Sequence, residues 1–454
     1  MFFLNIDIEK LHLIGNNDNM FVYYNLNLFS IDGVTCKIIQ LLQEGNDINK
    51  ISSELGLSFQ FIENKLRFLA GTANTDYSLA PKVEKRKVQR ITLHVSNDCN
   101  LRCKYCYANG GNYHLERKLM SEATAELFVK FCIREFDEIG EIVFFGGEPL
   151  MNLSIMQRIC ISFNEAFNDH RIKAVPAFNL ITNGTLLNEM IIRFIQKYIK
   201  RITVSIDGPK FINDQTRIFA NGNGSYDSII NFIQTIKKET NTVLQYEVTY
   251  TKLHKKYGLT YSKIREIMRS EHGIEGVIVP EYGPLEVCSS DLDCEEILNS
   301  DLDSLPGDFY YILQRLKKSE AAEMCNIVND IFAVSVDGDI YPCHMNVGER
   351  NTCLGNIAGN NIFDNGLAYP IFGCKNNELC NACWANELCG GCARFFFYDI
   401  NNKVYNKLPN SKNCDETRKY IHSLLYLIGC IRTDDVKWKE LLSLAKRIKY
   451  DAKY

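Results

Sequence analysis

Residues 91–107 read ITLHVSNDCNLRCKYCY and place three cysteines, Cys99, Cys103 and Cys106, directly after a predicted strand. The apolar and β-branched run at residues 91–95 predicts that strand. A [4Fe–4S] cube normally takes four thiolates, and a structural zinc ion also takes four ligands, so this loop is one ligand short for either. The CxxxCxxC spacing therefore indicates a cluster with one open iron that can chelate a small molecule. In a cysteine-rich chain the same spacing can also arise by chance.

The sequence around this loop alternates between predicted strands and predicted helices. Strand patterns lie at residues 91–95, 142–145, 178–182, 202–206, 244–249 and 277–279. Helical patterns lie near residues 122–138, 155–167, 189–199, 226–238 and 261–269. Strands separated by helices predict parallel β-α-β units. Six such units predict an α/β fold with an open, partial barrel, whose ligands gather at the carboxyl ends of the strands.

Composition limits the classes of function. The 454 residues favour two to four domains, and 46% hydrophobic with 23% charged residues is typical of a globular protein. A net charge of -4 gives no reason to expect nucleic acid. No apolar run reaches the roughly 18 residues that a membrane span needs, and the N-terminus carries Asp7 and Glu9 where a signal peptide would be basic and then apolar. We therefore expect a cytoplasmic protein without membrane or nucleic-acid partners.

The reducing cytosol makes disulfides rare, so most clustered cysteines among the 18 are expected to bind metal. Four isolated cysteines in apolar helical surroundings are instead expected to be small buried hydrophobes. They are Cys36, Cys132, Cys160 and Cys430.

Polar motifs follow the next strands at the same end of the predicted barrel. They are Gly146-Gly147-Glu148-Pro149, Thr182-Asn183-Gly184-Thr185, Ser205-Ile206-Asp207-Gly208 and, in the loop beyond, Arg217. Glycines let a backbone approach a ligand closely, and a carboxylate suits an ammonium group. A tight turn at a strand end explains the glycines equally well, but it does not require Glu148.

Together with CxxxCxxC, these motifs resemble the radical SAM superfamily. The resemblance implies a [4Fe–4S] cluster on the three cysteines, with the amino and carboxylate groups of S-adenosylmethionine (SAM) on the open iron. Reductive cleavage of SAM then gives a 5′-deoxyadenosyl radical that abstracts hydrogen. In this family Gly146, Gly147, Glu148 and Pro149 would hold the methionine end of SAM. Asn183 and Asp207 would line its pocket, Ser205 would approach the ribose, and Arg217 would lie near the carboxylate and ribose.

A second set of cysteines occupies the C-terminal third. Cys325 is followed by 12 residues, Gly338, four residues and Cys343, and Cys380, Cys383, Cys389 and Cys392 run as CxxCxxxxxCxxC ahead of Cys414. This order resembles the SPASM extension, which binds two auxiliary [4Fe–4S] clusters. The resemblance implies a distal cluster on Cys380, Cys383, Cys389 and Cys414 and a proximal cluster on Cys325, Cys343 and Cys392.

Two points about these auxiliary clusters stay open. The usual final spacing is CxxxC, and Cys389-Gly390-Gly391-Cys392 is one residue shorter, so the assignment of Cys389 and Cys392 is open. The proximal set has three cysteines, so Cys353 or Cys374 completes it, or the site stays open for a substrate thiolate. Cys353 has a simpler explanation as a packed residue in a strand, and a zinc ribbon built from the CxxC pairs is the alternative for the whole region.

Residues 1–80 are expected to form a separate unit, with strands at 2–8 and 20–26 and helices at 35–42, 48–55 and 60–69, the last capped by Ser58. The order resembles the PqqD-like peptide-recognition element, a winged-helix fold that binds leader peptides by strand addition, with residues 20–26 as the expected free edge. The alternative, a helix-turn-helix DNA binder, lacks a basic recognition helix.

The expected domains are 1–80 for leader recognition, 88–285 for the barrel, 286–324 as a bridge, 325–414 for the SPASM region and 415–454 as a C-terminal helical segment. The run Cys106–Gly111, CYANGG, is similar to loops in ranthipeptide maturases of the freyrasin type, which form thioethers. That resemblance implies a precursor peptide and an electron donor such as flavodoxin or ferredoxin as partners. It also implies a link from cysteine sulfur to a carbon of another residue, with acidic residues favoured. A carbon–carbon crosslinking maturase, a sulfatase-maturing dehydrogenase and an electron-carrying iron–sulfur protein remain alternatives.

Overall fold

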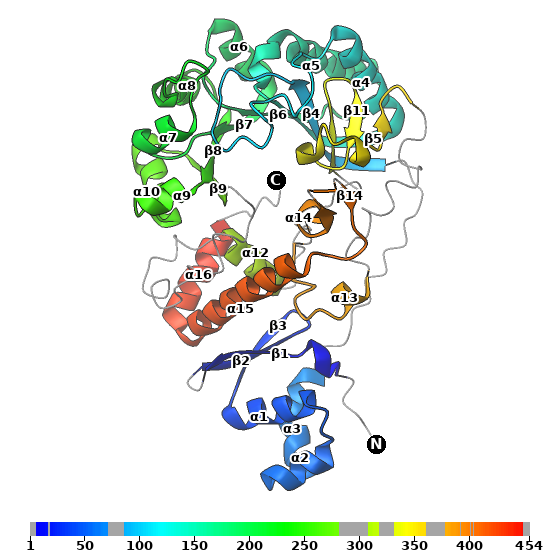
Figure 1. The fold of residues 1–454 in the computed structure, drawn as a ribbon, viewed down its shortest axis with the longest axis vertical. Coiled ribbons are helices and arrows are strands. Elements are labelled where there is room, and N and C mark those ends of the chain that lie inside the picture. The colour runs from blue at the N-terminus through cyan, green and yellow to red at the C-terminus, as the bar shows by residue number, and fades with distance from the viewer. Residues whose placement is uncertain are drawn as a thin grey trace.

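The computed structural model describes residues 6–16, 19–70, 86–280, 307–316, 331–359, 377–390, 392–399, 401–402 and 404–447. Its largest feature is a curved sheet with the strand order β12-β11-β10-β4-β5-β6-β7-β8-β9 (Figure 1). Six neighbouring strands of this sheet are parallel: β4 (Arg86–Ser96), β5 (Phe136–Gly146), β6 (Ala177–Thr182), β7 (Ile199–Ser205), β8 (Val243–Tyr250) and β9 (Glu275–Pro280). The six strands predicted from the sequence are therefore confirmed.

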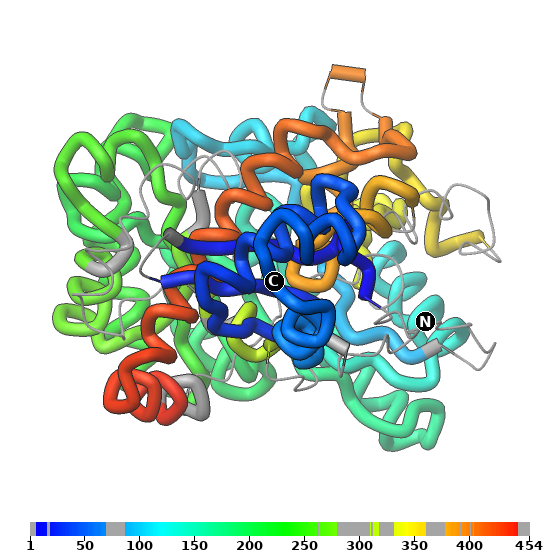
Figure 2. The backbone as a smooth tube through the Cα atoms, turned by 90° about the horizontal axis from the view of Figure 1, so that it is seen from below, coloured from blue at the N-terminus to red at the C-terminus, as the bar shows by residue number. Residues whose placement is uncertain are grey.

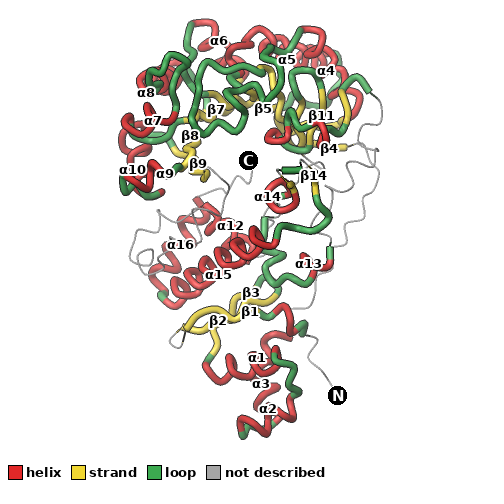
Figure 3. The backbone as a smooth tube through the Cα atoms, in the orientation of Figure 1, coloured by secondary structure: helices red, strands yellow, loops and turns green. Residues whose placement is uncertain are grey.

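Helices connect these strands and cover the outer face of the sheet (Figure 3). They are α4 (Glu122–Glu135), α5 (Leu153–Asn168), α6 (Glu189–Tyr198), α7 (Lys210–Thr216), α8 (Tyr226–Glu239), α9 (Lys252–Lys256) and α10 (Tyr261–His272), with a 3-10 turn η2 (Pro149–Asn152) before α5. The helix predicted at 122–138 ends earlier, at Glu135, because Phe136 already begins β5. Buried apolar residues of strands and helices form one core between sheet and helices, which leaves the inner face of the sheet to polar side chains.

A buried ionic network closes the amino-terminal end of this inner face. Glu141 on β5 accepts hydrogen bonds from Arg90 Nε at 2.5 Å, Asn179 Nδ2 at 2.5 Å and Arg201 Nη2 at 3.0 Å. These residues come from β4, β6 and β7, so their ends are tied together by one carboxylate. A buried charge is stable only when it is paired and hydrogen-bonded in this way. The network fixes the floor of the barrel and leaves its carboxyl end for the site.

A hairpin from the C-terminal third extends the sheet beyond β4. Strand β10 (Ile331–Val334) runs parallel to β4, β11 (Asp339–Tyr341) pairs antiparallel with β10, and β12 (Gly355–Asn356) pairs with β11. The short turns η4 (His344–Asn346) and η5 (Arg350–Thr352) lie between β11 and β12. Because β11 runs back along the sheet, Cys343 follows it near the level of Arg90 on β4 and not at the carboxyl end of the barrel.

The N-terminal unit consists of η1 (Ile8–Lys10), a three-stranded sheet and three helices. The elements are β1 (His12–Asn16), β2 (Asn19–Tyr24), β3 (Asn27–Ile31), α1 (Gly33–Gln43), α2 (Ile48–Leu55) and α3 (Phe59–Ala70). All three predicted helices are confirmed, and Ser58 caps α3 by accepting from Phe61 N at 3.2 Å. The predicted strand at 2–8 is wrong in its described part, because residues 8–10 form a 3-10 turn; residues 1–5 lie outside the described residues.

The expected free edge at residues 20–26 is also wrong. Strand β2 is the centre of the sheet and pairs with β1 on one side and β3 on the other. Asn25 and Leu26 have positive φ values of 46° and 57°, as a two-residue hairpin turn requires. The sequence signal for that turn was missed because Leu is an unusual residue at such a φ. The edges of the sheet are β1 and β3.

The C-terminal elements lie between this unit and the barrel (Figures 1 and 2). They include α12 (Gly307–Leu316), α13 (Glu378–Asn381), α14 (Ala393–Phe397), the pair β13 (Tyr398–Asp399) and β14 (Val404–Tyr405), α15 (Ser411–Thr433) and α16 (Asp435–Arg447). One apolar core joins β1–β3, α12, α15 and α16, and a second core lies between β1–β3 and α1–α3. The N-terminal sheet is therefore packed on both faces. In the described part of the chain no helix is long and apolar enough to cross a bilayer.

Candidate iron–sulfur and SAM site

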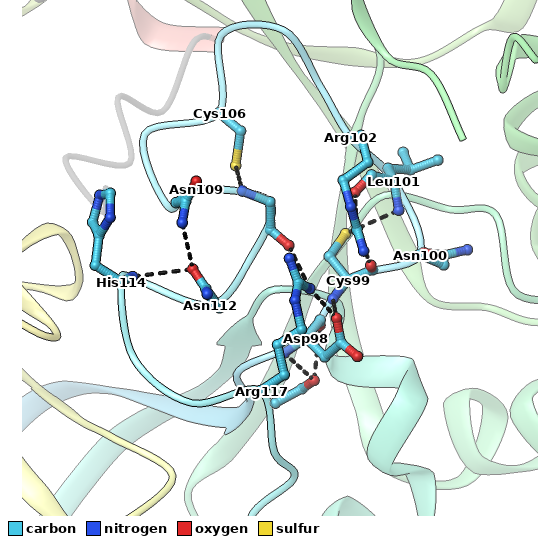
Figure 4. Close-up of polar contacts among 12 residues, drawn as sticks. Asp98, Cys99, Asn100, Leu101, Arg102, Cys106, Asn109, Asn112, His114 and Arg117 are labelled. Carbon is cyan, nitrogen blue, oxygen red and sulfur yellow. Dashed lines mark hydrogen bonds and ion pairs between the residues drawn. The ribbon is translucent and has the colours of Figure 1, made fainter. Parts of the chain in front are cut away.

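The loop after β4 carries Cys99, Cys103 and Cys106 across the carboxyl end of the barrel. Its backbone is bonded to the segment beyond α7, because Arg102 N donates to Ile218 O at 2.7 Å and Lys104 N donates to Thr216 O at 3.0 Å. Arg117 forms an ion pair with Asp98 and also donates to Gly110 O, which ties the two ends of the loop together (Figure 4). The loop is thus held at both sides, as a site that positions a cofactor needs.

Two of the three sulfur atoms accept N–H hydrogen bonds. Cys99 Sγ accepts from Leu101 N at 3.4 Å and from Asn183 Nδ2 at 3.6 Å. Cys106 Sγ accepts from Gly110 N at 3.3 Å. Figure 4 shows this bond as the dashed line at the Cys106 sulfur. Hydrogen bonds to ligand sulfur are one of the ways in which a protein tunes an iron–sulfur cluster. The donor set therefore fits the cluster that the sequence predicts.

The thiols of this loop are shielded from water. Burial raises the pKa of Cys99 to about 12, and the nearby Glu148 carboxylate adds to the shift. Burial also raises the pKa of Cys103, although Arg217 opposes the shift. Thiolates bind metal, so a strong Lewis acid has to displace these protons. Within the described residues no three His, Cys, Asp or Glu side chains lie close enough for a single metal ion; the sulfur ligands of a cube sit further apart than those of one ion.

Three glycines let the end of β5 pass directly against the cysteine loop. A Cβ on Gly146 would clash with Ser96 O, and one on Gly147 would clash with Asp98 O. A Cβ on Gly111, which has a φ of +91°, would lie 2.7 Å from Gly147 Cα. The glycines are therefore needed for contact between two backbone segments of the site itself, and not only for the approach of a ligand.

Glu148 lies inside the protein and its carboxylate is fully hydrogen-bonded. Oε1 accepts from Leu150 N at 3.0 Å and Thr182 Oγ1 at 2.8 Å, and Oε2 accepts from Asn183 N at 2.8 Å. Burial raises the pKa of Glu148, and these hydrogen bonds oppose that shift. In this structure Glu148 joins the ends of β5 and β6. Its expected contact with an ammonium group stays a prediction, as do the other cofactor contacts.

Asn183, at the end of β6, links the strand ends to the cysteine loop. Its Nδ2 also donates to Asn100 Oδ1 at 2.9 Å, and its Oδ1 accepts from Thr185 Oγ1 at 2.6 Å. Asn100 Nδ2 donates to Thr185 Oγ1 at 2.8 Å, which completes a ring of three side chains. The structure thus brings Asn183 next to Cys99. A pocket in which Asn183 lines bound SAM beside the cluster of Cys99 requires this contact. Asn100 and Thr185 complete the contact.

Asp207 and Arg217 meet through Tyr105, a residue between the second and third cysteines. Tyr105 Oη lies 2.7 Å from Asp207 Oδ2 and accepts from Arg217 Nη1 at 2.6 Å. Asp207 also accepts from Thr216 Oγ1 at 2.6 Å and Thr249 N at 3.2 Å. Arg217 Nε is buried and has no hydrogen-bond partner among the described residues. A buried guanidinium nitrogen without a partner fits an anionic group such as the carboxylate of SAM.

Several residues that face this end of the barrel were not found from the sequence. Tyr105 stood inside the cysteine motif and was passed over. Tyr107 and Tyr113 form an aromatic pair with ring centroids 6.0 Å apart, and Tyr113 Oη donates to Gly146 O at 3.1 Å. Glu247 is the one charged residue in strand β8, which reads VLQYEVTY, and this is the signal that could have identified it.

The C-terminal cysteines group as the sequence order predicts. Burial raises the pKa of Cys414 to about 11, and Cys389, Cys380 and Cys383 are close enough to add to the shift. Burial likewise raises the pKa of Cys343 to about 11, with a further contribution from Cys392. The thiols that influence each other are members of the expected distal and proximal sets, and their ligation of clusters stays a prediction. Cys325 and Cys374 lie outside the described residues, so their places in the sets stay predictions.

Cys353 is oriented away from the proximal set. Its Sγ donates to Gly355 O at 3.3 Å, and its side chain packs with Tyr341 and Val347 in a small apolar cluster. Burial raises the pKa of Cys353, and the charged neighbour that adds to the shift is Asp339, not a cysteine. This arrangement favours the packed role over ligation. Of the isolated cysteines, Cys36, Cys132 and Cys160 are buried as expected, whereas Cys430 is only partly buried.

Sequence and structure comparisons agree with this geometry. Residues 93–270 match the sequence model of the Radical SAM superfamily. The chain is 26% identical over 365 residues to a cysteine-type anaerobic sulfatase-maturating enzyme of Clostridium novyi, which covers 72% of this chain and 91% of that protein. It is 24% identical over 271 residues to the radical SAM cyclopropyl synthase TigE of Paramaledivibacter caminithermalis, which covers 52% of this chain and 55% of TigE.

Solved structures show the same fold. The structure of anSMEcpe with bound AdoMet covers 79% of this chain and 96% of its own, with a TM-score of 0.60 at 20% identity. The structure of anSMEcpe with AdoMet and the Cp18Cys peptide gives a TM-score of 0.59 at 22% identity and covers 79% and 100%. The barrel of this chain is therefore a radical SAM domain, and the chain is homologous to SPASM-type maturases. This similarity supports an enzyme with a [4Fe–4S] cluster and SAM.

Proposed function

We propose that this protein is a cytoplasmic maturase that forms thioether crosslinks in a ribosomally made peptide. One observation carries the proposal: Tyr107, in the loop of the SAM-cluster cysteines, lies close to both Cys106 and Cys343. This contact supports a proximal auxiliary cluster near the loop of the SAM cluster, with the substrate held between them. TigE and the sulfatase-maturating enzymes, by their names, also modify carbon centres or proteins.

The residues of the chain divide the work. When bound, the cluster on Cys99, Cys103 and Cys106 together with SAM supplies a 5′-deoxyadenosyl radical that takes a hydrogen atom from carbon. Arg217, with its free Nε, binds the carboxylate of SAM, and Asn183 holds the rim of the pocket against Cys99. Gly146 and Gly147 keep β5 against the loop so that no side chain fills the space for the methionine end. Cys343 and Cys392 hold an auxiliary [4Fe–4S] cluster with Cys325, and the distal four cysteines hold a second.

A peptide with cysteine and acidic residues is the proposed substrate, and its leader is held by the N-terminal unit. The sheet has two edges, β1 and β3. His12 at the start of β1 is stacked on Trp384 with ring centroids 3.5 Å apart, so the edge at β1 already has a neighbour in the chain. The outer edge of β3 is therefore the proposed binding edge. Leu28 O on β3 accepts from Arg432 Nη1 at 3.0 Å, so it faces outward. In an antiparallel pair outward groups alternate, so the N–H of exposed Ser30 also faces the edge. Flavodoxin or ferredoxin is the proposed electron donor.

The product test uses the reconstituted, full-length enzyme and any short cysteine-rich peptide that is encoded beside its gene. We expect a product two hydrogens lighter per crosslink, in which the linked cysteine resists alkylation, and no such product from a Cys→Ser peptide. A product that keeps free thiols would favour carbon–carbon crosslinking, and an aldehyde at the cysteine would favour a sulfatase-maturing type of dehydrogenase. Either result would reject thioether formation.

The leader test changes only the backbone of the β3 edge. Deleting residues 1–80 would expose the face of α15, because Phe21, Tyr23 and Leu28 share its core, so a point variant is cleaner. Ser30→Pro removes one outward N–H and leaves the bonds to β2, whereas Ser30→Ala keeps the N–H. We expect Ser30→Pro to weaken peptide binding about tenfold by fluorescence anisotropy, with SAM cleavage by dithionite unchanged. Equal binding by both variants would place the leader elsewhere.

A further inference from the structure

Glu247 lies on the inner face of β8, near its carboxyl end. Its neighbours Tyr246 and Val248 are fully buried in the core behind the sheet, so alternation along the strand points Glu247 to the opposite face. It is in register with Ser205 on β7, the residue expected to approach the ribose of SAM. Glu247 is only half-buried, so its carboxylate faces the open end of the barrel.

Three carboxylates follow strands at this end of the barrel, and they differ in their hydrogen bonds. Glu148 is held by three donors and Asp207 by donors from Tyr105, Thr216 and Thr249. Across the described ranges of the chain the Glu247 carboxylate accepts no hydrogen bond, and the charged groups near it are Arg217 and Asp207. The carboxylates of Glu148 and Asp207 therefore hold neighbouring segments of the protein together, whereas the carboxylate of Glu247 has free acceptor positions.

Tyr107 shows on which side of the chamber Glu247 lies. Cys343, Cys106 and Glu247 are near enough to the Tyr107 hydroxyl to raise its pKa, and Tyr113 is its hydrogen-bond partner. Tyr107 is 48% exposed, so it borders open space rather than core. Glu247 thus lies between the loop of the SAM cluster and the hairpin that carries Cys343. A peptide residue entering from the barrel mouth would meet this carboxylate.

We propose that Glu247 is the catalytic residue that accepts the proton of the substrate thiol, which rests on the proposed function. In the step, the S–H and C–H bonds break and the S–C bond forms. The hydrogen atom of the C–H bond goes to the deoxyadenosyl radical derived from SAM, the thiol proton goes to Glu247, and the remaining electron goes to an oxidised iron–sulfur cluster. Two hydrogens leave the peptide in total, as one atom, one proton and one electron.

The surroundings of Glu247 suit this role. Burial raises the pKa of Glu247, Arg217 opposes the shift, and Asp207 adds to it. A carboxylate with a raised pKa is a stronger base, because its pKa is closer to that of a thiol. Because the base must be ionised, the rate of crosslinking should fall as the pH drops through the raised pKa of Glu247. The groups that face it are Arg217 after α7, Asp207 after β7 and Tyr107 in the loop after β4.

The test compares Glu247→Gln with Glu275→Gln, a matched change at an exposed carboxylate on β9 that pairs with Arg269. Both variants are reconstituted as full-length protein. We expect unchanged iron content and SAM affinity within about twofold by equilibrium dialysis, since Glu247 is not a ligand of SAM. Glu148 also has a raised pKa and absorbs in every variant, so the signal of interest is the contribution of Glu247 to the infrared band of protonated carboxyl groups. This contribution should titrate above the ordinary range of Glu in the wild type and in Glu275→Gln. It should be lost in Glu247→Gln.

With a peptide that the wild type converts, Glu247→Gln should crosslink about 100-fold more slowly. It should still transfer deuterium from labelled peptide to 5′-deoxyadenosine. A tenfold loss of SAM affinity, loss of deuterium transfer, or an infrared band unaffected by Glu247→Gln would overturn the assignment. Normal crosslinking by Glu247→Gln would overturn it and leave the proposed function intact. If the wild type crosslinked no peptide, the proposed function would fail, and the infrared and dialysis results would still decide whether Glu247 is an unpaired carboxylate outside the SAM site.

Discussion

The two cysteine-rich regions of this protein are built in different ways. In the loop after β4 the three cysteines lie within a stretch of eight residues, and their hydrogen-bond donors include Leu101 and Gly110 of the same loop. In the C-terminal region Cys380 belongs to α13, Cys383 and Cys389 to the following turns, and Cys414 to the first turn of α15. The first site is local in sequence and rests on the barrel, whereas the second exists only when α15 packs in its place.

The difference teaches where each site is vulnerable. The first loop is fixed by the barrel through Asn183, Thr216 and Ile218, and by the ion pair between Asp98 and Arg117. The distal cysteines depend on α15, whose other face packs on the N-terminal sheet. Cys380 Sγ accepts from Asn377 Nδ2 at 3.2 Å, and Arg418 of α15 reaches toward Cys383 at 3.9 Å. A change on the N-terminal side can therefore disturb the distal site without touching the first.

The largest effect is expected from the first loop. Changing Cys99, Cys103 and Cys106 together to Ala should remove about four of roughly twelve irons per chain after anaerobic reconstitution. It should also abolish SAM cleavage, because the cofactor loses its iron. Iron analysis and the release of 5′-deoxyadenosine measure both. Zinc in place of iron, without visible charge-transfer absorption, would contradict the cluster assignment.

A smaller, selective effect is expected in α15. Cys414→Ala should lose about four irons of the distal cluster and keep dithionite-driven SAM cleavage, because the barrel loop is intact. Cys430→Ala, on the same helix but outside the distal set, is the control and should keep all irons. If Cys414→Ala retained full iron content, the distal set would need another fourth ligand.

The packing of α15 on the N-terminal sheet is tested at Gly429. A Cβ at this position would lie 2.7 Å from the ring of Phe21 on β2, so Gly429→Ala should destabilise by about 1–3 kcal/mol in spite of a better helix propensity. Gly33→Ala at the start of α1, where a Cβ meets nothing within 4 Å, should leave the urea midpoint unchanged or slightly raised. Equal urea midpoints for Gly429→Ala and Gly33→Ala would show that α15 is not closely packed on the N-terminal sheet at Gly429.

The smallest effect is a pH dependence at the same interface. His12 Nε2 and His422 Nδ1 share a hydrogen bond of 3.0 Å, and burial, with His422, lowers the pKa of His12 from 6.5 to about 3. At pH values between about 6.5 and 3, His12 binds a proton in the unfolded chain but stays neutral in the folded protein. Falling pH therefore favours the unfolded state, and the stability contributed by neutral His12 is lost as the pH falls from about 6.5 toward 3. His12→Phe keeps a ring on Trp384 but cannot titrate.

The measurement for His12 is the thermal midpoint between pH 7 and pH 5. The wild type should lose more than His12→Phe over this interval. His170→Gln, at an exposed turn, is the control and should follow the wild type. An identical loss in His12→Phe and wild type would show that other groups cause the acid sensitivity.

The sequence by itself determined the barrel and its first site. Each parallel strand is a short run rich in apolar and β-branched residues between amphipathic helices, and the face buried against those helices makes the run readable from its pattern alone. The carboxyl ends of parallel strands meet at one edge, so motifs at successive strand ends, such as Cys99, Gly146 and Asn183, had to converge. Local spacing and a simple topology were sufficient because neither depends on how distant segments pack.

Only the tertiary structure decided the roles within that frame. Glu148 and Asp207 were expected at the cofactor and are held by protein donors, whereas Glu247 is left without one; which carboxylate receives donors depends on neighbouring strands and on loops such as that of Tyr105. The order of β1, β2 and β3 was also hidden, because a hairpin with Leu26 at positive φ carries no turn signal. Hydrogen-bond partners and strand order arise from contacts between residues far apart in the chain, and a linear pattern holds no record of those contacts.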